Sequence, residues 1–179
     1  MLLAGCGSDE TSPEVATAPP QGAVRINFEG TATGGKVCNI ATHTMTFGSV
    51  SSSQRSLITA GEDGSAISCS VGEEADAFAV DITFQQGSDR FTLRSQSLPS
   101  DASQGNPAPA SVSFTSEMTV KPFISLPAEP CNLYFASADQ SVAAGSLWAS
   151  LQCPVIENAS SASSCLLAES VLSFERCDE

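Results

Sequence analysis

Apolar and polar residues alternate along most of this chain with a period of two, the repeat of a β-strand that buries one face. The clearest run places Phe78, Val80, Ile82 and Phe84 on one face, and a similar run starts at Ala23. Further short runs lie at 67–71, 91–93, 112–114, 133–135, 147–151 and 172–174. Together they predict about nine or ten strands and no long amphipathic helix.

Glycine and proline separate these runs and indicate turns and loops. The polar connection 85–89 contains Gly87, which suits a hairpin between two strands. The stretch from Ser97 to Ala110 is rich in proline, so it is either an exposed hairpin loop or a binding loop displayed by a rigid domain. Short strands joined in this way predict an all-β fold, an antiparallel β-sandwich of immunoglobulin-like or jelly-roll-like architecture.

A change of composition divides the chain near residue 22. Residues 7–22 are mainly Ser, Thr, Pro, Glu and Ala and have few large apolar groups, which is typical of a disordered tether. At Ala23 the pattern changes to a strict alternation of apolar and polar residues. We therefore expect a tether over residues 6–22 and a single β-sandwich domain over residues 23–179, a length that suits one hydrophobic core.

Seven cysteines occur, and the first, Cys6, lies before the predicted domain. The other six are Cys38, Cys69, Cys131, Cys153, Cys165 and Cys177. An even number in an exported protein predicts three disulfides that staple the fold, whereas the absence of a CxxC pair argues against zinc. From the order of the runs we expect the pairs Cys38–Cys69, Cys131–Cys177 and Cys153–Cys165.

The residues Leu3-Ala4-Gly5-Cys6 resemble the lipobox of bacterial lipoproteins. The resemblance implies that Cys6 is lipidated, that residues 1–5 are the remnant of a signal peptide, and that the protein is exported. It also implies a lipid anchor in the bacterial outer membrane or at the cell surface, with which Gly7 is compatible. No basic and apolar leader precedes the motif in this sequence, so we expect the true start of translation to lie upstream.

The net charge of −13, from 20 acidic and 7 basic residues, makes the chain strongly acidic. Nucleic acid is not expected as a partner, because binding a polyanion requires clustered Lys and Arg. The acidic residues are scattered, which favours a solvated surface. The expected partners are the membrane, through the N-terminal lipid, and envelope proteins or glycans.

No catalytic motif is present, and we expect a protein that is not an enzyme. The single histidine, His43, lies in a run that predicts an exposed strand position. No nucleophile elbow or Ser-x-x-Lys motif occurs, although a hydrolase that uses paired carboxylates stays open as an alternative.

Two further features carry alternative interpretations. Trp148 is out of phase with Leu147 and Leu151, so it either covers a sheet or forms a platform for ligand binding. The acidic segments 62–64 and 73–76 are either solvated turns or ligands of a structural calcium ion, and no other cofactor or metal is expected.

These observations predict a lipid-anchored, non-enzymatic protein of the cell envelope with a structural or interaction role. The alternative is a module that binds a carbohydrate or small ligand, with Trp148 as the candidate contact. An envelope hydrolase is the less favoured third possibility.

Overall fold

The computed structural model describes residues 18–30, 37–119, 121–158, 160 and 163–178. In these residues the only helical element is the short 3-10 helix η1 (Glu62–Gly64). The strands are β1 (Gln21–Glu29), β2 (His43–Phe47), β3 (Ser49–Val50), β4 (Arg55–Ser56), β5 (Ile58–Thr59), β6 (Ser65–Glu74), β7 (Ala77–Gln86), β8 (Asp89–Leu98), β9 (Ala108–Thr115), β10 (Phe123–Ser125), β11 (Cys131–Tyr134), β12 (Ser141–Ala143), β13 (Ser146–Asn158) and β14 (Ser163–Glu175). The predicted all-β class is confirmed.

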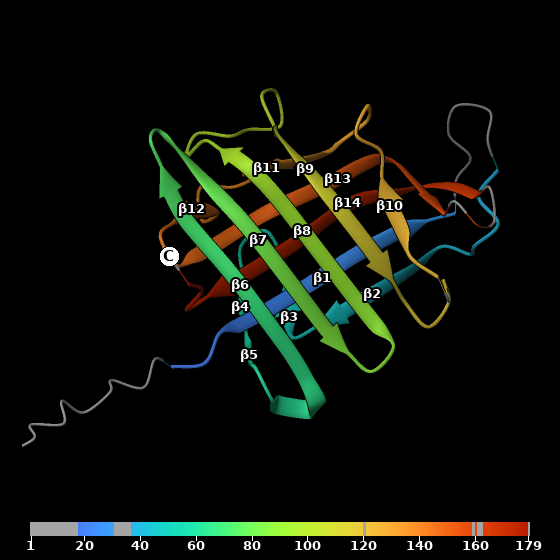
Figure 1. Ribbon diagram of the computed structural model, residues 1–179, viewed down its shortest axis with the longest axis horizontal. Coiled ribbons are helices and arrows are strands. Elements are labelled where there is room, and N and C mark those ends of the chain that lie inside the picture. Colours follow the sequence, from blue (N-terminus) through green and yellow to red (C-terminus); the bar gives the residue numbers. More distant parts are fainter. Residues whose placement is uncertain (1–17, 31–36, 120, 159, 161–162, 179) are drawn as a thin grey trace, which may run out of the picture.

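The strands form two layers that cross steeply (Figure 1). One layer contains β6, β7, β8 and β9, and behind it run β1, β2, β13 and β14. All pairings between these strands are antiparallel. Strands β10 and β11 each pair with both β9 and β13, so the two layers belong to one 12-stranded sheet that turns the corner of the sandwich.

The core fills the space between the layers because each strand turns its apolar face inward. In β7 and β8 the residues Val80, Ile82, Phe84, Phe91 and Leu93 are at most 3% exposed. The described ranges contain fourteen strands instead of nine or ten, since the apolar runs do not reveal very short strands such as β3, β4 and β5.

A second, smaller cluster lies on the outer face of β1, β13 and β14. It consists of Ala23, Val50, Trp148 and Val171, with Leu57 packed against it. The β3–β4 hairpin brings Val50 onto this face. As a result β13 is buried on both faces over Leu147–Leu151, where the sequence predicts a strand with one buried face.

Element boundaries agree with the sequence in most places. Strand β1 begins at Gln21, two residues before the expected domain start. The stretch from Ser97 to Ala110 is a β8–β9 connection in which the strands extend to Leu98 and resume at Ala108. Among the described residues no helix has the length and apolar character required to cross a bilayer.

Three disulfides are formed, but all three expected pairings are wrong. The bonds join Cys38 to Cys165, Cys69 to Cys177, and Cys131 to Cys153.

The register of the strands explains the difference. The β13–β14 hairpin continues well beyond the expected strand ends, so Cys153 lies opposite Leu167 and Cys165 opposite Ile156. Two cysteines of this hairpin therefore do not face each other. Strand β11 pairs with β13 and not with the end of β14, which places Cys131 beside Cys153.

Candidate functional site

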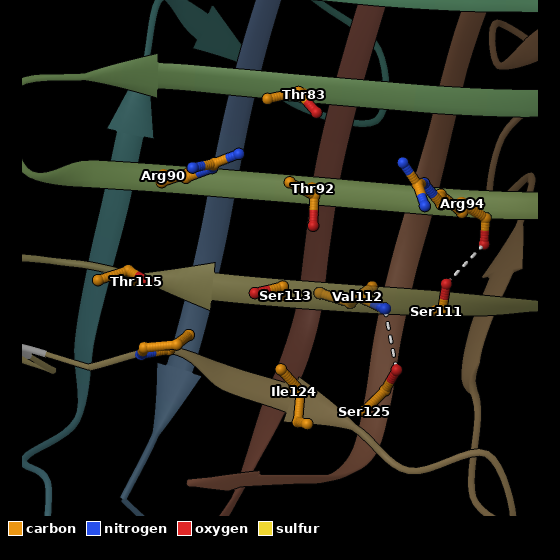
Figure 2. A pocket seen from close by; sticks show the side chains of 11 residues that line it. Thr83, Arg90, Thr92, Arg94, Ser111, Val112, Ser113, Thr115, Ile124 and Ser125 are labelled. Carbon is orange, nitrogen blue, oxygen red and sulfur yellow. Dashed lines mark hydrogen bonds between the residues drawn. The ribbon is translucent and has the colours of Figure 1, made fainter.

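A groove crosses the outer face of β7, β8, β9 and β10 (Figure 2). Its volume is about 640 Å³. The lining residues are mostly hydroxyl-bearing, with two arginines and a few apolar groups: Thr83, Arg90, Thr92, Arg94, Ser111, Val112, Ser113, Thr115, Pro122, Ile124 and Ser125. It is an open surface on the sheet, and the strands determine which side chains face it.

Strand alternation sends these side chains outward. In β8, Phe91 and Leu93 are buried, so Arg90, Thr92 and Arg94 point to the opposite face. The antiparallel register then places Thr83, Thr92 and Ser113 side by side across three strands. Ile124 of β10 continues this row and is 44% exposed.

The charged side chains that line the groove are two arginines, although the protein as a whole is strongly acidic. No aspartate or glutamate is among its lining residues. Arg94 forms an ion pair with Asp81, with 2.9 Å between Nε and Oδ2, and both side chains are well exposed. Such an exposed pair contributes about 0–1 kcal/mol, so the Arg94 guanidinium can exchange it for another anion.

A second hollow continues the groove along β9 toward the β10–β11 connection. Its volume is about 470 Å³, and it shares Arg94, Ser111 and Ser125 with the first. Its other walls are largely apolar and come from β9 and from the β10–β11 connection: Pro109, Ala110, Leu126, Pro127 and Pro130. Ser97 and Pro109, at the two ends of the proline-rich stretch, also line it.

Trp148, the expected candidate for ligand contact, is covered. It is 9% exposed, and its indole nitrogen donates a hydrogen bond to the carbonyl of Ser51 at 3.1 Å. The guanidinium of Arg55 lies over the ring. Of the two interpretations of Trp148, this geometry fits the cover of a sheet and not a ligand platform, because the β3–β4 hairpin folds over this part of β13.

His43 meets Ser116 at one corner of the sandwich. The two ring nitrogens contact the carbonyl of Ala41 at 2.9 Å and the hydroxyl of Ser116 at 2.8 Å. A carbonyl only accepts, so in the neutral ring Nδ1 donates to Ala41 and Nε2 accepts the Ser116 proton.

This geometry resembles a base beside a nucleophile, but Ser116 is 4% exposed. Its oxygen also accepts from the backbone amide of Thr119. The amide of Glu117 donates to Asp89, so it is not free to stabilise an oxyanion. The pair connects β2 to the turn after β9.

The two acidic segments for which calcium binding is the alternative to solvated turns lie at opposite ends of β6. Glu62 and Asp63 precede the strand, and Glu73 and Glu74 end it. A strand of ten residues spans about 30 Å, so these carboxylates do not share one ion. In the described part of the chain no group of three or more metal-ligating side chains converges.

Cys6 lies outside the described residues, and the expected lipidation stays a prediction. The six remaining cysteines are all in disulfides. The groove was not among the sequence candidates, although a signal was present. Along the groove, the outward positions of β8 are Arg90, Thr92 and Arg94, and those of β9 are Ser111, Ser113 and Thr115. Two of the seven basic residues in the chain therefore lie on the same face of one strand.

Comparison with protein-family models, curated proteins and solved structures found no match for this chain. The site is therefore interpreted from its own geometry.

Proposed function

We propose that this protein is an exported, lipid-anchored domain of the bacterial cell envelope that acts by binding and not by catalysis. The observation that carries the proposal is the set of three disulfides. Cys131, Cys153 and Cys165 are fully buried, and Cys69 and Cys177 are at most 8% exposed. Disulfides built into a core in this way form and persist in oxidising compartments.

The odd cysteine supports the lipid anchor. With six cysteines paired, Cys6 is the one residue of its type left over. A free thiol in an oxidising compartment would be exposed to oxidation or mispairing, and acylation of Cys6 avoids this. Two or more acyl chains would hold the domain stably at a membrane.

The binding role rests on the groove across β7–β10. It is outward-facing, and it concentrates hydrogen-bonding side chains on one face. The second candidate, a module that binds a carbohydrate or small ligand, is favoured at this groove instead of at Trp148. A hydrolase that used Ser116 as its nucleophile is disfavoured by the burial of that side chain, and the alternative that uses paired carboxylates stays untested.

Metabolic labelling with a fatty-acid analogue tests the anchor. The protein is expressed in a bacterial host behind a lipoprotein signal peptide that ends at Cys6. Label and membrane association are expected in the parent and absent in Cys6→Ser, which keeps size and polarity. Equal labelling of the two proteins would overturn the lipid anchor.

A further inference from the structure

We infer that the groove across β7–β10 binds an acidic polysaccharide, an extended sugar chain that carries carboxylate or sulfate groups. The inference rests on the proposed binding role and gives it a ligand class. Three features of the groove support it: the placement of its arginines, its row of hydroxyl groups, and its length and open shape.

Charge is the first argument. A protein with a net charge of −13 repels polyanions, so an anionic ligand needs a local basic site. Arg90 and Arg94 project from the same face of β8, four residues apart, which separates them by about 13 Å. Among the described residues Arg90 forms no ion pair. Arg94 pairs with the exposed carboxylate of Asp81. A guanidinium binds carboxylate or sulfate through two parallel hydrogen bonds.

The hydroxyl groups are the second argument. Between and beside the arginines lie six side chains that both donate and accept hydrogen bonds: Thr83, Thr92, Ser111, Ser113, Thr115 and Ser125. Sugar hydroxyls have the same dual character. An acidic peptide offers far fewer such groups, so the row favours a sugar chain over a peptide as the ligand.

Shape is the third argument. A site for a small molecule buries most of its ligand in a concave pocket. Here the groove is open along the sheet and continues into a second hollow of about 470 Å³. Ile124, Leu126 and the nearby prolines give that path apolar walls, against which the C–H faces of sugar rings can pack. A polymer gains contacts along the whole path, whereas a small ligand uses only part of it.

The test measures binding of the lipid-free protein to polygalacturonate and to dextran sulfate by calorimetry, with neutral dextran and polyglutamate as comparisons. Binding to at least one of the acidic polysaccharides and to neither comparison is expected. Arg90→Gln and Arg94→Gln should each weaken it roughly tenfold, the value of one charged hydrogen bond. Arg176→Gln removes the same charge at an exposed site outside the groove and should leave affinity unchanged.

Asp81→Asn provides a test with the opposite sign. It removes the carboxylate that competes for Arg94, so affinity for the acidic polysaccharide should rise by up to about fivefold. A general loss of folding cannot produce this increase. Added salt should weaken binding in all variants.

Two outcomes would overturn the inference. One is the absence of binding to both acidic polysaccharides, and binding of polyglutamate alone would then make the ligand an acidic peptide. The other is polysaccharide binding that survives Arg90→Gln and Arg94→Gln.

Retention of the lipid-free protein on isolated envelopes separates failure of this inference from failure of the proposed binding role. Retention without polysaccharide binding leaves the binding role standing, and loss of both removes it.

Discussion

The guanidinium carbon of Arg55 lies 4.6 Å from the centroid of the Trp148 ring. The same guanidinium donates to the hydroxyl of Ser173 at 2.9 Å and pairs with Glu175 at 2.8 Å. Arg55 thus fastens the β3–β4 hairpin to β13 and β14 at one point. Arg55 covers the Trp148 ring, which would otherwise face solvent, and the ring is part of the smaller buried cluster on the outer face of β1, β13 and β14.

Arg55→Ala is expected to lower the free energy of unfolding by about 0.5–2 kcal/mol. The loss combines the cation–π contact, worth about 0.5–1 kcal/mol at exposed sites, with a partly exposed ion pair worth about 0–1 kcal/mol. Trp148 is the only tryptophan, so urea unfolding followed by its fluorescence measures the change directly. Arg176→Ala serves as the matched control. If Arg55→Ala shifts the midpoint no more than this control, the hairpin is held by other contacts.

Peptide mapping under non-reducing conditions should recover Cys38 with Cys165, Cys69 with Cys177, and Cys131 with Cys153. Replacing both members of one pair by alanine should cost about 2–5 kcal/mol, the usual range for a native disulfide. The chain-entropy model predicts a larger cost for Cys69–Cys177, which closes 108 residues, than for Cys131–Cys153, which closes 22. Recovery of Cys38 with Cys69 would contradict the strand register.

Tyr134 makes stability depend on alkaline pH. Burial, with a smaller contribution from the Glu169 carboxylate, raises its pKa above the ordinary value of 10.0. The unfolded chain then releases the phenolic proton at lower pH than the folded protein does. The stabilising contribution is complete below pH 10.0 and is lost as pH rises through the folded pKa.

Tyr134→Phe should therefore show a shallower loss of stability above pH 10.0 than the parent. Tyr134 is the only tyrosine, so tyrosinate absorbance reports its titration without overlap from another tyrosine. Parallel pH profiles for the two proteins would show that the phenol titrates alike in both states.

Ser116 should resist labelling by a fluorophosphonate, a reagent that phosphonylates activated serines with loss of fluoride. The prediction follows from the 4% exposure of Ser116 and from the hydrogen bond that its hydroxyl oxygen accepts from the amide of Thr119. Intact-mass spectrometry checks it, with Ser116→Ala as the control. Labelling that disappears in this variant and in His43→Gln would restore an envelope hydrolase as the function.

The strands could be predicted because their apolar alternation follows directly from one-sided burial. The runs containing Val24 and Ile82 lie in β1 and β7 as expected. The environment of Trp148 could not be predicted in this way. Its cover comes from β3 and β4, strands of two residues that carry no periodic signal.

Disulfide pairing and the groove depend on information beyond local pattern. Pairing Cys131 with Cys153 requires knowing that β11 lies beside β13, which is a matter of long-range strand order. The groove requires that β8 and β9 be neighbours, so that Arg94 and Ser111 face the same way. Each strand shows its polar face in the sequence, and only the sheet order shows that these faces join.

The C-terminal residues beyond β14 have a consequence for self-association. The amide of Val71 donates to the carbonyl of Asp178, and the amide of Asp178 donates to the carbonyl of Cys69. These bonds occupy the middle of the outer edge of β6, the terminal strand of its layer, where a strand from another molecule could otherwise add. The Cys69–Cys177 bond holds this cap in place. We therefore expect that reduction of this bond loosens the cap and exposes this part of the edge to pairing with another copy of the protein.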